Sequence, residues 1–156
     1  MNNFLSLFIK DRYKKPMTAL DLGCGEGLDI KELKTQGWVV KGLDLPKVNL
    51  NNPYNSKLKF DLVFSIAVLQ FIKNKEIFIE TCYNNLKKDG DIFLLTFDKS
   101  DRIVKNCFTK TDIRKLLKGK FNNIKIEKLE IDDDHRPIGK HKHVVLIATA
   151  SKGLKI

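Results

Sequence analysis

Cysteine is scarce in this sequence, and long apolar runs are missing. Cys24, Cys82 and Cys107 are the three cysteines among 156 residues. Because their number is odd and no CxxC pair occurs, neither a disulfide framework nor a thiolate zinc site is expected. The stretch FDLVFSIAVLQFI is broken by polar residues well short of a membrane span, and the first positive charges follow the first apolar residues instead of preceding them. A cytoplasmic chain without membrane association is therefore predicted.

The charge is basic but is not concentrated in one block. The chain has 29 lysines and arginines against 19 aspartates and glutamates, a formal net charge of +10. The densest basic segments, DIRKLLKGK and HRPIGKHKH, lack the interleaved aromatic residues of a base-stacking surface. A nucleic-acid partner is thus possible but not favoured. With 42% hydrophobic and 31% charged residues, residues 1–156 are expected to form a single globular domain.

Apolar periodicity predicts that strands and helices alternate along the chain. The last two strands are joined by the polar segment DDDHRPIGK, a predicted loop with no helix, so they are expected to pair antiparallel. Thr109 and Asp112 have the spacing of a capping-box variant at the start of the last helix. The pattern predicts a three-layer α/β domain whose sheet is mostly parallel with an antiparallel carboxyl-terminal hairpin. Helices are expected at residues 2–15, 29–36, 74–88 and 110–118, and strands at 17–22, 38–45, 60–67, 91–97, 123–131 and 143–150.

A glycine-rich turn, ALDLGCGEG, stands between the first predicted strand and the helix that follows. Gly23, Gly25 and Gly27 let the backbone bend where side chains would obstruct it, and such a turn brings the backbone close to a ligand beyond the strand ends. A dinucleotide fingerprint GxGxxG would need glycine at position 28, where the chain has Leu28. The spacing therefore disfavours a pyrophosphate ligand. A turn without any ligand is the alternative.

The GxGxG spacing after Asp-Leu resembles motif I of the Rossmann-like (class I) S-adenosylmethionine-dependent methyltransferases. From about residue 18 to residue 150 the resemblance continues: LKKDGDIFLLTF is similar to the family's LKPGG segment and fifth strand. HKHVVLIATA resembles the last strand of small-molecule methyltransferases related to tellurite-resistance enzymes. The resemblance implies methyl transfer from S-adenosylmethionine to a small-molecule acceptor, with S-adenosylhomocysteine as product. An RNA or protein methyltransferase and a non-catalytic S-adenosylmethionine-binding protein remain alternatives.

The resemblance also implies which residues bind the cofactor. Asp44 follows the glycines by about twenty positions, where the family's acidic residue accepts hydrogen bonds from both ribose hydroxyls. Asn49 stands where shortened members have an aspartate that binds the adenine amino group, and its carbonyl oxygen can still accept. The implied cofactor-binding set is Asp21, Gly23, Cys24, Gly25, Gly27, Asp44, Leu45, Asn49, Leu50, Ser65 and Ile66.

The segment PKVNLNNPYNSKLK, residues 46–59, is too short for the family's usual third helix and full third strand. The sheet is therefore expected to be shortened at this edge. The helix predicted at residues 2–15 carries Phe4, Leu5 and Phe8 on one face. By analogy with the family, this helix is expected to cover the cofactor and line the acceptor pocket, together with residues 65–71 and the histidine-bearing loop.

Three histidines, His135, His141 and His143, lie in or beside the last predicted loop, next to the acidic residues 132–134. His141 and His143 are two positions apart, so on a strand they share one face. With a carboxylate they could bind a divalent metal or act as a base over the acceptor, and solvated side chains are the simpler alternative. No metal site is expected. No catalytic triad is expected either, because the sulfonium methyl group is already activated.

Overall fold

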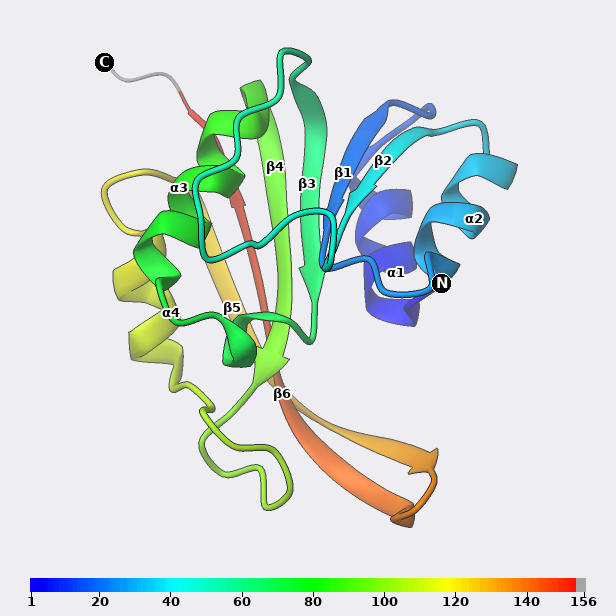
Figure 1. Cartoon of the computed structure of the whole chain (residues 1–156), viewed down its shortest axis with the longest axis vertical. Coiled ribbons are helices and arrows are strands. Elements are labelled where there is room, and N and C mark those ends of the chain that lie inside the picture. Colours follow the sequence, from blue (N-terminus) through cyan, green and yellow to red (C-terminus); the bar gives the residue numbers. More distant parts are fainter. Residues whose placement is uncertain (154–156) are drawn as a thin grey trace.

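The computed structural model describes residues 1–153, and its six strands form one sheet in the order β2-β1-β3-β4-β6-β5 (Figure 1). The first four strands run parallel, and β6 is antiparallel to both β4 and β5. The predicted fold class is confirmed. The elements are α1 (Asn3–Arg12), β1 (Thr18–Leu22), α2 (Leu28–Thr35), β2 (Val39–Leu43), β3 (Phe60–Ile66), the short helix η1 (Leu69–Phe71), α3 (Lys75–Asn85), β4 (Leu86–Phe97), α4 (Lys110–Leu117), β5 (Asn122–His135) and β6 (Gly139–Ser151).

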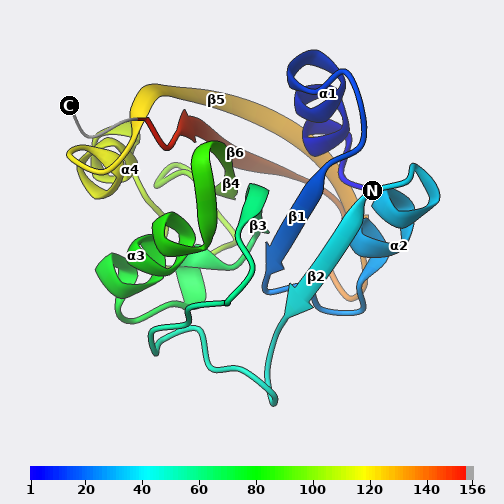
Figure 2. The same ribbon diagram turned by 90° about the horizontal axis from the view of Figure 1, so that it is seen from above.

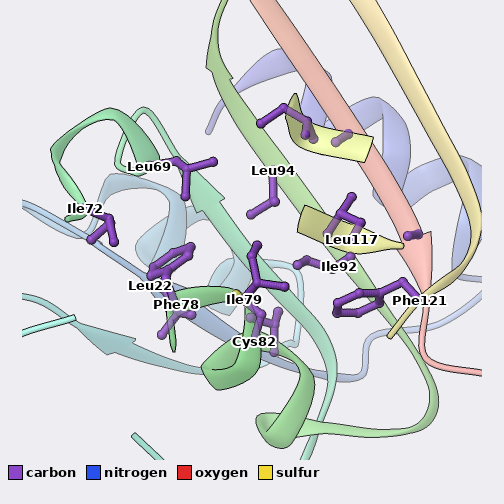
Figure 3. Close-up of a cluster of buried hydrophobic side chains, with 14 of the residues drawn as sticks. Leu22, Leu69, Ile72, Phe78, Ile79, Cys82, Ile92, Leu94, Leu117 and Phe121 are labelled. Atoms are coloured by element: carbon purple, nitrogen blue, oxygen red, sulfur yellow. The ribbon is translucent and has the colours of Figure 1, made fainter. Parts of the chain in front are cut away.

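Helices cover both faces of the sheet, with α1 and α2 on one side and α3 and α4 on the other (Figures 1 and 2). The strands in the middle of the sheet are buried on both faces, which is why β3 and β4 read as nearly continuous apolar runs. On the α3 side, Phe78, Ile79 and Cys82 pack against the sheet and against α4 (Figure 3). Removal of this apolar surface from water is the main stabilising contribution to such a core.

Local sequence signals fix several element ends. The Thr109 hydroxyl accepts the Asp112 N–H, and the Asp112 carboxylate accepts the Thr109 N–H at 2.8 Å, so the predicted capping box is present. Gly119 follows α4 in the left-handed region, at φ +86°. Helix α3 ends at Asn85, three residues before the predicted boundary, because residues 86–88 already belong to the irregular start of β4.

The prediction of a loop at residues 132–140 is wrong. β5 and β6 continue through most of it as a two-stranded arm that projects beyond the sheet and turns at residues 136–138 (Figure 1). Aspartate, lysine and glycine are depleted in strands, which concealed the arm in the sequence. Cross-strand pairs such as Lys142 with Glu130, at 2.6 Å, support the pairing despite that composition.

The shortened connection after β2 runs as an extended loop across the α3 face, without a helix or a strand, as the sequence predicts (Figure 1). Two buried polar side chains of α3 hold it in place. Thr81 Oγ1 accepts the Tyr54 N–H at 3.2 Å, and Asn85 Oδ1 accepts the Ser56 N–H at 2.7 Å. The Asn85 amide also donates to the Tyr54 carbonyl at 2.8 Å. These bonds satisfy loop backbone groups that no strand partner reaches.

Helix α1 lies along the sheet face, and its expected role of covering the cofactor stays a prediction. Leu5 and Ile9 are buried in the core beneath it. At one end the Asn2 N–H donates to Asp29 Oδ1 at the start of α2, at 2.6 Å. At the other end Arg12 Nε donates to Asp91 Oδ2 near the amino ends of the parallel strands, at 2.7 Å. Only the amino end of α1 therefore reaches the edge that bears the glycine turn.

Candidate cofactor and acceptor site

The candidate site lies where the sheet changes direction. From β1 the chain passes through α2 to β2 on one side, whereas β3 pairs with the other side of β1. The connections beyond the carboxyl ends of β1 and β3 therefore diverge, and ligands of open α/β sheets bind in such a crevice. The glycine turn, residues 23–27, occupies this position (Figure 1).

The glycine turn is tied to the end of β2 and shaped by its glycines. The N–H groups of Gly23 and Cys24 both donate to the Leu43 carbonyl, at 2.7 and 3.2 Å. At Gly23 the backbone has φ +89°, and a Cβ there would lie 2.3 Å from Val68 Cγ2. Gly25 has φ +49°, and a Cβ there would meet no atom within 4 Å. Gly23 thus permits close packing, whereas Gly25 borders open space large enough for a ligand to approach its backbone.

The half-buried Asp44 faces this turn from the end of β2. Its Oδ2 accepts the Gly25 N–H at 2.6 Å, and its Oδ1 accepts the Leu45 N–H at 2.7 Å. A carboxylate has about four acceptor positions, so both oxygens can accept further hydrogen bonds. The arrangement fits a ligand that presents two hydroxyl groups to Asp44.

Carboxylates surround the turn. Asp21, at the end of β1, is 3% exposed. Burial, with the nearby carboxylates of Asp29 and Asp44, raises the pKa of Asp21 to about 8. Burial, with the nearby carboxyl groups of Asp21 and Asp44, also raises the pKa of the Cys24 thiol. The carboxylates of Asp29 and Asp44 give this place a negative potential, which favours a cation and repels a phosphate.

The end of β3 forms the other wall of the crevice. The Ser65 hydroxyl donates to the Leu22 carbonyl at 2.7 Å, and Ser65 is 2% exposed, so its side chain joins β1 to β3. Ile66 is half-buried, and Ala67 has φ +56° immediately after the strand. The Gln70 amide donates to the Ala67 carbonyl at 2.8 Å and supports this bend. The structure therefore places Ser65 beneath the site, with Ile66 nearer to its surface.

The three remaining residues of the implied set lie in the loop after β2. The side chain of Leu45 is 69% exposed beside Asp44. Asn49 Oδ1 accepts the N–H and the side-chain amide of Asn51, at 3.0 and 3.2 Å, so its carbonyl oxygen serves the loop's own turn. Leu50 is buried in the core on the α3 side. Of these three side chains, those of Leu45 and Asn49 are exposed, whereas that of Leu50 is not.

The histidines lie on the arm formed by β5 and β6, at the same edge of the sheet as the glycine turn (Figure 1). His143 is buried, and its Nδ1 lies 2.8 Å from Asp101 Oδ2 in the loop after β4. His141 Nε2 lies 3.0 Å from His143 Nε2, and Asp133 Oδ2 lies 3.0 Å from His135 Nδ1. The structure thus brings the three histidines together with Asp133 on paired strands.

A protein-family model described as a methyltransferase domain matches residues 3–136 of the chain. The chain belongs to this methyltransferase family. The ubiquinone biosynthesis O-methyltransferases of Pelagibacter ubique and Rattus norvegicus are 26% and 28% identical to it, over 58% and 64% of this chain and 46% and 40% of their own. The methyltransferase domain thus spans less than half the length of these two curated relatives.

Solved structures share the fold of this methyltransferase domain. A S-adenosylmethionine-dependent methyltransferase from Methanosarcina mazei is 16% identical with a TM-score of 0.78, and the alignment covers 99% of both chains. TehB from Haemophilus influenzae is 15% identical with a TM-score of 0.79, over 97% of this chain and 62% of that one. A Burkholderia thailandensis 1,6-didemethyltoxoflavin-N1-methyltransferase, solved with 1,6-didemethyltoxoflavin and S-adenosylhomocysteine, is 17% identical with a TM-score of 0.73, over 97% and 78%.

Sequence reasoning missed three residues around the site. Val68 packs against Gly23, Asp29 binds the amino end of α1, and Asp101 holds His143. The position of Asp29 in the first turn of α2 was a usable signal, because acidic residues are favoured there. Val68 and Asp101 lie in irregular segments, where no periodicity marks a contact. Within residues 1–153, no helix combines the length and the apolar content needed to cross a bilayer.

Proposed function

We propose that this protein is an S-adenosylmethionine-dependent methyltransferase that acts on a small-molecule acceptor. The observation that carries the proposal is the pair of carboxylates, Asp29 and Asp44, beside the open glycine turn, with the buried Asp21 beneath it. S-adenosylmethionine carries a positive sulfonium and an ammonium group, which this charge attracts. A dinucleotide would place two phosphates at the same turn, against the carboxylates.

In this proposal the chain's residues mainly orient the reactants. Asp44 accepts hydrogen bonds from the ribose hydroxyls. The Gly23–Gly27 turn lets the ligand approach the backbone closely, and Leu45 provides apolar surface beside the adenosine. The bound cofactor supplies an activated methyl group on sulfur, so the protein must align the acceptor for in-line attack and keep water away. Asp21, Cys24 and Ser65 support the crevice from below, and we assign Asn49 and Leu50 to the loop that borders it.

Similar proteins support a small acceptor, since they include a ubiquinone biosynthesis O-methyltransferase and a 1,6-didemethyltoxoflavin-N1-methyltransferase. We also propose that residues 1–156 act as a single methyltransferase domain, because all six strands belong to the same sheet. A cytoplasmic location is the further proposal, supported by the free thiols of Cys24, Cys82 and Cys107.

Calorimetry with S-adenosylhomocysteine and with NAD tests the cofactor directly. We expect clear binding of S-adenosylhomocysteine and much weaker binding of NAD. Transfer of labelled methyl from S-adenosylmethionine is then followed on small phenols, thiols and amines, with RNA and protein as competing acceptors. Preference for NAD would overturn the cofactor assignment. Salt-dependent labelling of RNA would show that the acceptor is RNA and not a small molecule. Tight cofactor binding without any methyl transfer would indicate a non-catalytic binding protein.

Substitution of Gly25 tests where the cofactor lies. In Gly25→Ala the new Cβ enters the open space of the turn, so S-adenosylhomocysteine should bind at least about tenfold more weakly, while a residue with positive φ costs about 1 kcal/mol of stability. Gly119→Ala is the matched control, because Gly119 has φ +86° and equally open surroundings but ends α4. Equal affinity of the two variants for S-adenosylhomocysteine would mean that Gly25 does not border the cofactor.

A further inference from the structure

The arm formed by β5 and β6 has two chemically different faces. In its register Asp133 pairs with His141, Ile131 with His143 and His135 with Gly139. Directly paired residues of antiparallel strands point to the same side, so Asp133 and the three histidines share one face. Asp132 and Asp134 pair with Lys142 and Lys140 on the opposite face. Charge neutralisation across the strands thus explains one face and leaves the histidine face to be explained.

The hydrogen bonds of the rings determine which nitrogens carry protons. His141 Nδ1 lies 2.6 Å from the Gly139 carbonyl, which can only accept, so this nitrogen carries the hydrogen. His143 Nδ1 faces Asp101 Oδ2 at 2.8 Å. The Asp101 carboxylate already accepts backbone N–H groups from Ile103, Val104 and Val144, so it accepts here as well. In the neutral rings, each Nε2 atom therefore carries no hydrogen and presents a lone pair.

These two lone pairs face each other. His141 Nε2 and His143 Nε2 are 3.0 Å apart, and Asp133 Oδ2 lies 3.7 Å from each of them. Three electron-rich atoms converging on one point repel one another unless a positive charge lies between them. A single shared proton would join two of the atoms, whereas a metal cation can bind all of them.

We propose that Asp133, His135, His141 and His143 form a binding site for a divalent transition metal of the zinc class. One ligand atom from each residue lies within 4.8 Å of all the others. Ligands at 2.0–2.1 Å from a tetrahedral zinc ion are about 3.3 to 3.4 Å apart, close to the 3.0 and 3.7 Å separations found here. The site departs from the absence of metal expected from the sequence.

The surroundings of the ligands are those of a metal site. His143 is oriented by a carboxylate and His141 by a backbone carbonyl, the outer contacts that fix the tautomer of metal-binding histidines. Imidazole is a poor ligand for magnesium or calcium and a good one for zinc, copper, nickel and iron. Asp133 and His135 have side chains that are 42% and 49% exposed, which gives an ion a path of entry.

Direct metal binding tests the proposal without reference to methyl transfer. The full chain, stripped with a chelator, is titrated with Zn²⁺ by calorimetry and with Co²⁺ by visible absorption. We expect saturation at a single equivalent, the visible bands of tetrahedral Co²⁺, and a higher melting temperature with Zn²⁺ because the ion binds the folded state. Absence of stoichiometric Zn²⁺ binding would overturn the proposal and would leave the cofactor assignment untouched.

A matched pair of variants locates the ion. Asp133→Asn should weaken Zn²⁺ binding by at least about tenfold and remove most of the rise in melting temperature. Asp134→Asn, one residue along and on the opposite face, should bind Zn²⁺ as the unaltered chain does. His135→Ala provides a second variant, because His135 is exposed and its loss leaves the Asp101–His143 contact intact. An equal effect of Asp133→Asn and Asp134→Asn, or none from His135→Ala, would contradict the assignment.

Discussion

At the residue scale, Asp21 connects the chemistry of the site with the stability of the fold. It ends β1 beneath the glycine turn, and burial with two neighbouring carboxylates raises its pKa from 3.8 to about 8. A carboxyl group in such a place keeps its proton at neutral pH until a cation arrives. Asp44, whose carboxylate accepts hydrogen bonds from two backbone N–H groups, lies half-buried at the same crevice. Asp21 and Asp44 lie near the same turn, but Asp21 is buried whereas Asp44 is only half-buried.

The raised pKa of Asp21 predicts how stability depends on pH. The folded state keeps the proton up to about pH 8, whereas the unfolded chain releases it near pH 3.8, so this group's contribution to stability falls as pH rises between these values. The Asp21→Asn variant has no carboxyl group at this position, so it does not lose this contribution to stability as the pH rises. The free energy of unfolding of the variant minus that of the unaltered chain should therefore be larger at pH 9 than at pH 5.

Urea denaturation without ligand at the two pH values measures this difference. Glu32→Gln, an exposed substitution on α2, is the control and should show no comparable change. A difference for Asp21→Asn that stays constant, or that shrinks with rising pH, would mean that Asp21 is ionised in the folded protein at neutral pH.

At the element scale, the loop after β2 replaces a helix and a strand, and α3 provides its anchors. Asn85, fully buried at the end of α3, accepts the Ser56 N–H and donates to the carbonyls of Tyr54 and Thr81. The loop also contributes Leu50 to the core, so its path is fixed by apolar burial as well as by these bonds.

Asn85→Ala should destabilise the protein by about 2 to 3 kcal/mol, because it leaves buried backbone groups of the loop without partners. Asn84→Ala is the matched control: Asn84 is half-buried on the same helix and bonds to Glu80 Oε1 at 3.3 Å, so the cost should stay within about 0.5 kcal/mol. Chemical denaturation of both variants gives the comparison. Similar losses in the two would show that the loop does not depend on Asn85.

At the scale of the whole molecule, the two ends of the parallel strands, which form two opposite edges of the sheet, have different roles. The edge at the carboxyl ends of the parallel strands bears the glycine turn, the loop after β4 and the histidine-bearing arm (Figure 1). At the other edge, Arg12, Tyr13 and Ser151 converge on Asp91, and these hydrogen bonds join α1 to the sheet. Helix α1 spans the distance between the two edges, so one end is structural and the other borders the site.

Hydrogen exchange distinguishes the two ends of α1. Addition of S-adenosylhomocysteine should slow exchange in the Gly23–Gly27 turn and at the first residues of the chain, where Asn2 contacts Asp29. The interior of α1 should not respond, because Leu5 and Ile9 pack in the core with or without ligand. Protection throughout α1 would instead indicate that the helix closes over the site. Peptides from α4 provide the reference.

The sequence by itself determined the features that depend on short-range geometry. The glycine spacing defined the turn, the Thr109–Asp112 pair defined the start of α4, and the apolar runs defined the central strands, because backbone conformation and burial periodicity are properties of neighbouring residues. Asp44 was predicted as well, through its fixed distance from the glycines, and the structure places its carboxylate 2.6 Å from the Gly25 nitrogen.

The tertiary structure alone decided which distant residues meet. Val68 against Gly23, α1 along the sheet face, and Asp101 beside His143 all join segments whose approach depends on packing of the whole sheet. The histidines show the difference most directly. The sequence placed them in or beside a loop, and only the register of β5 on β6 brought all three to one face with Asp133, because a shift by one residue would have turned the side chains away.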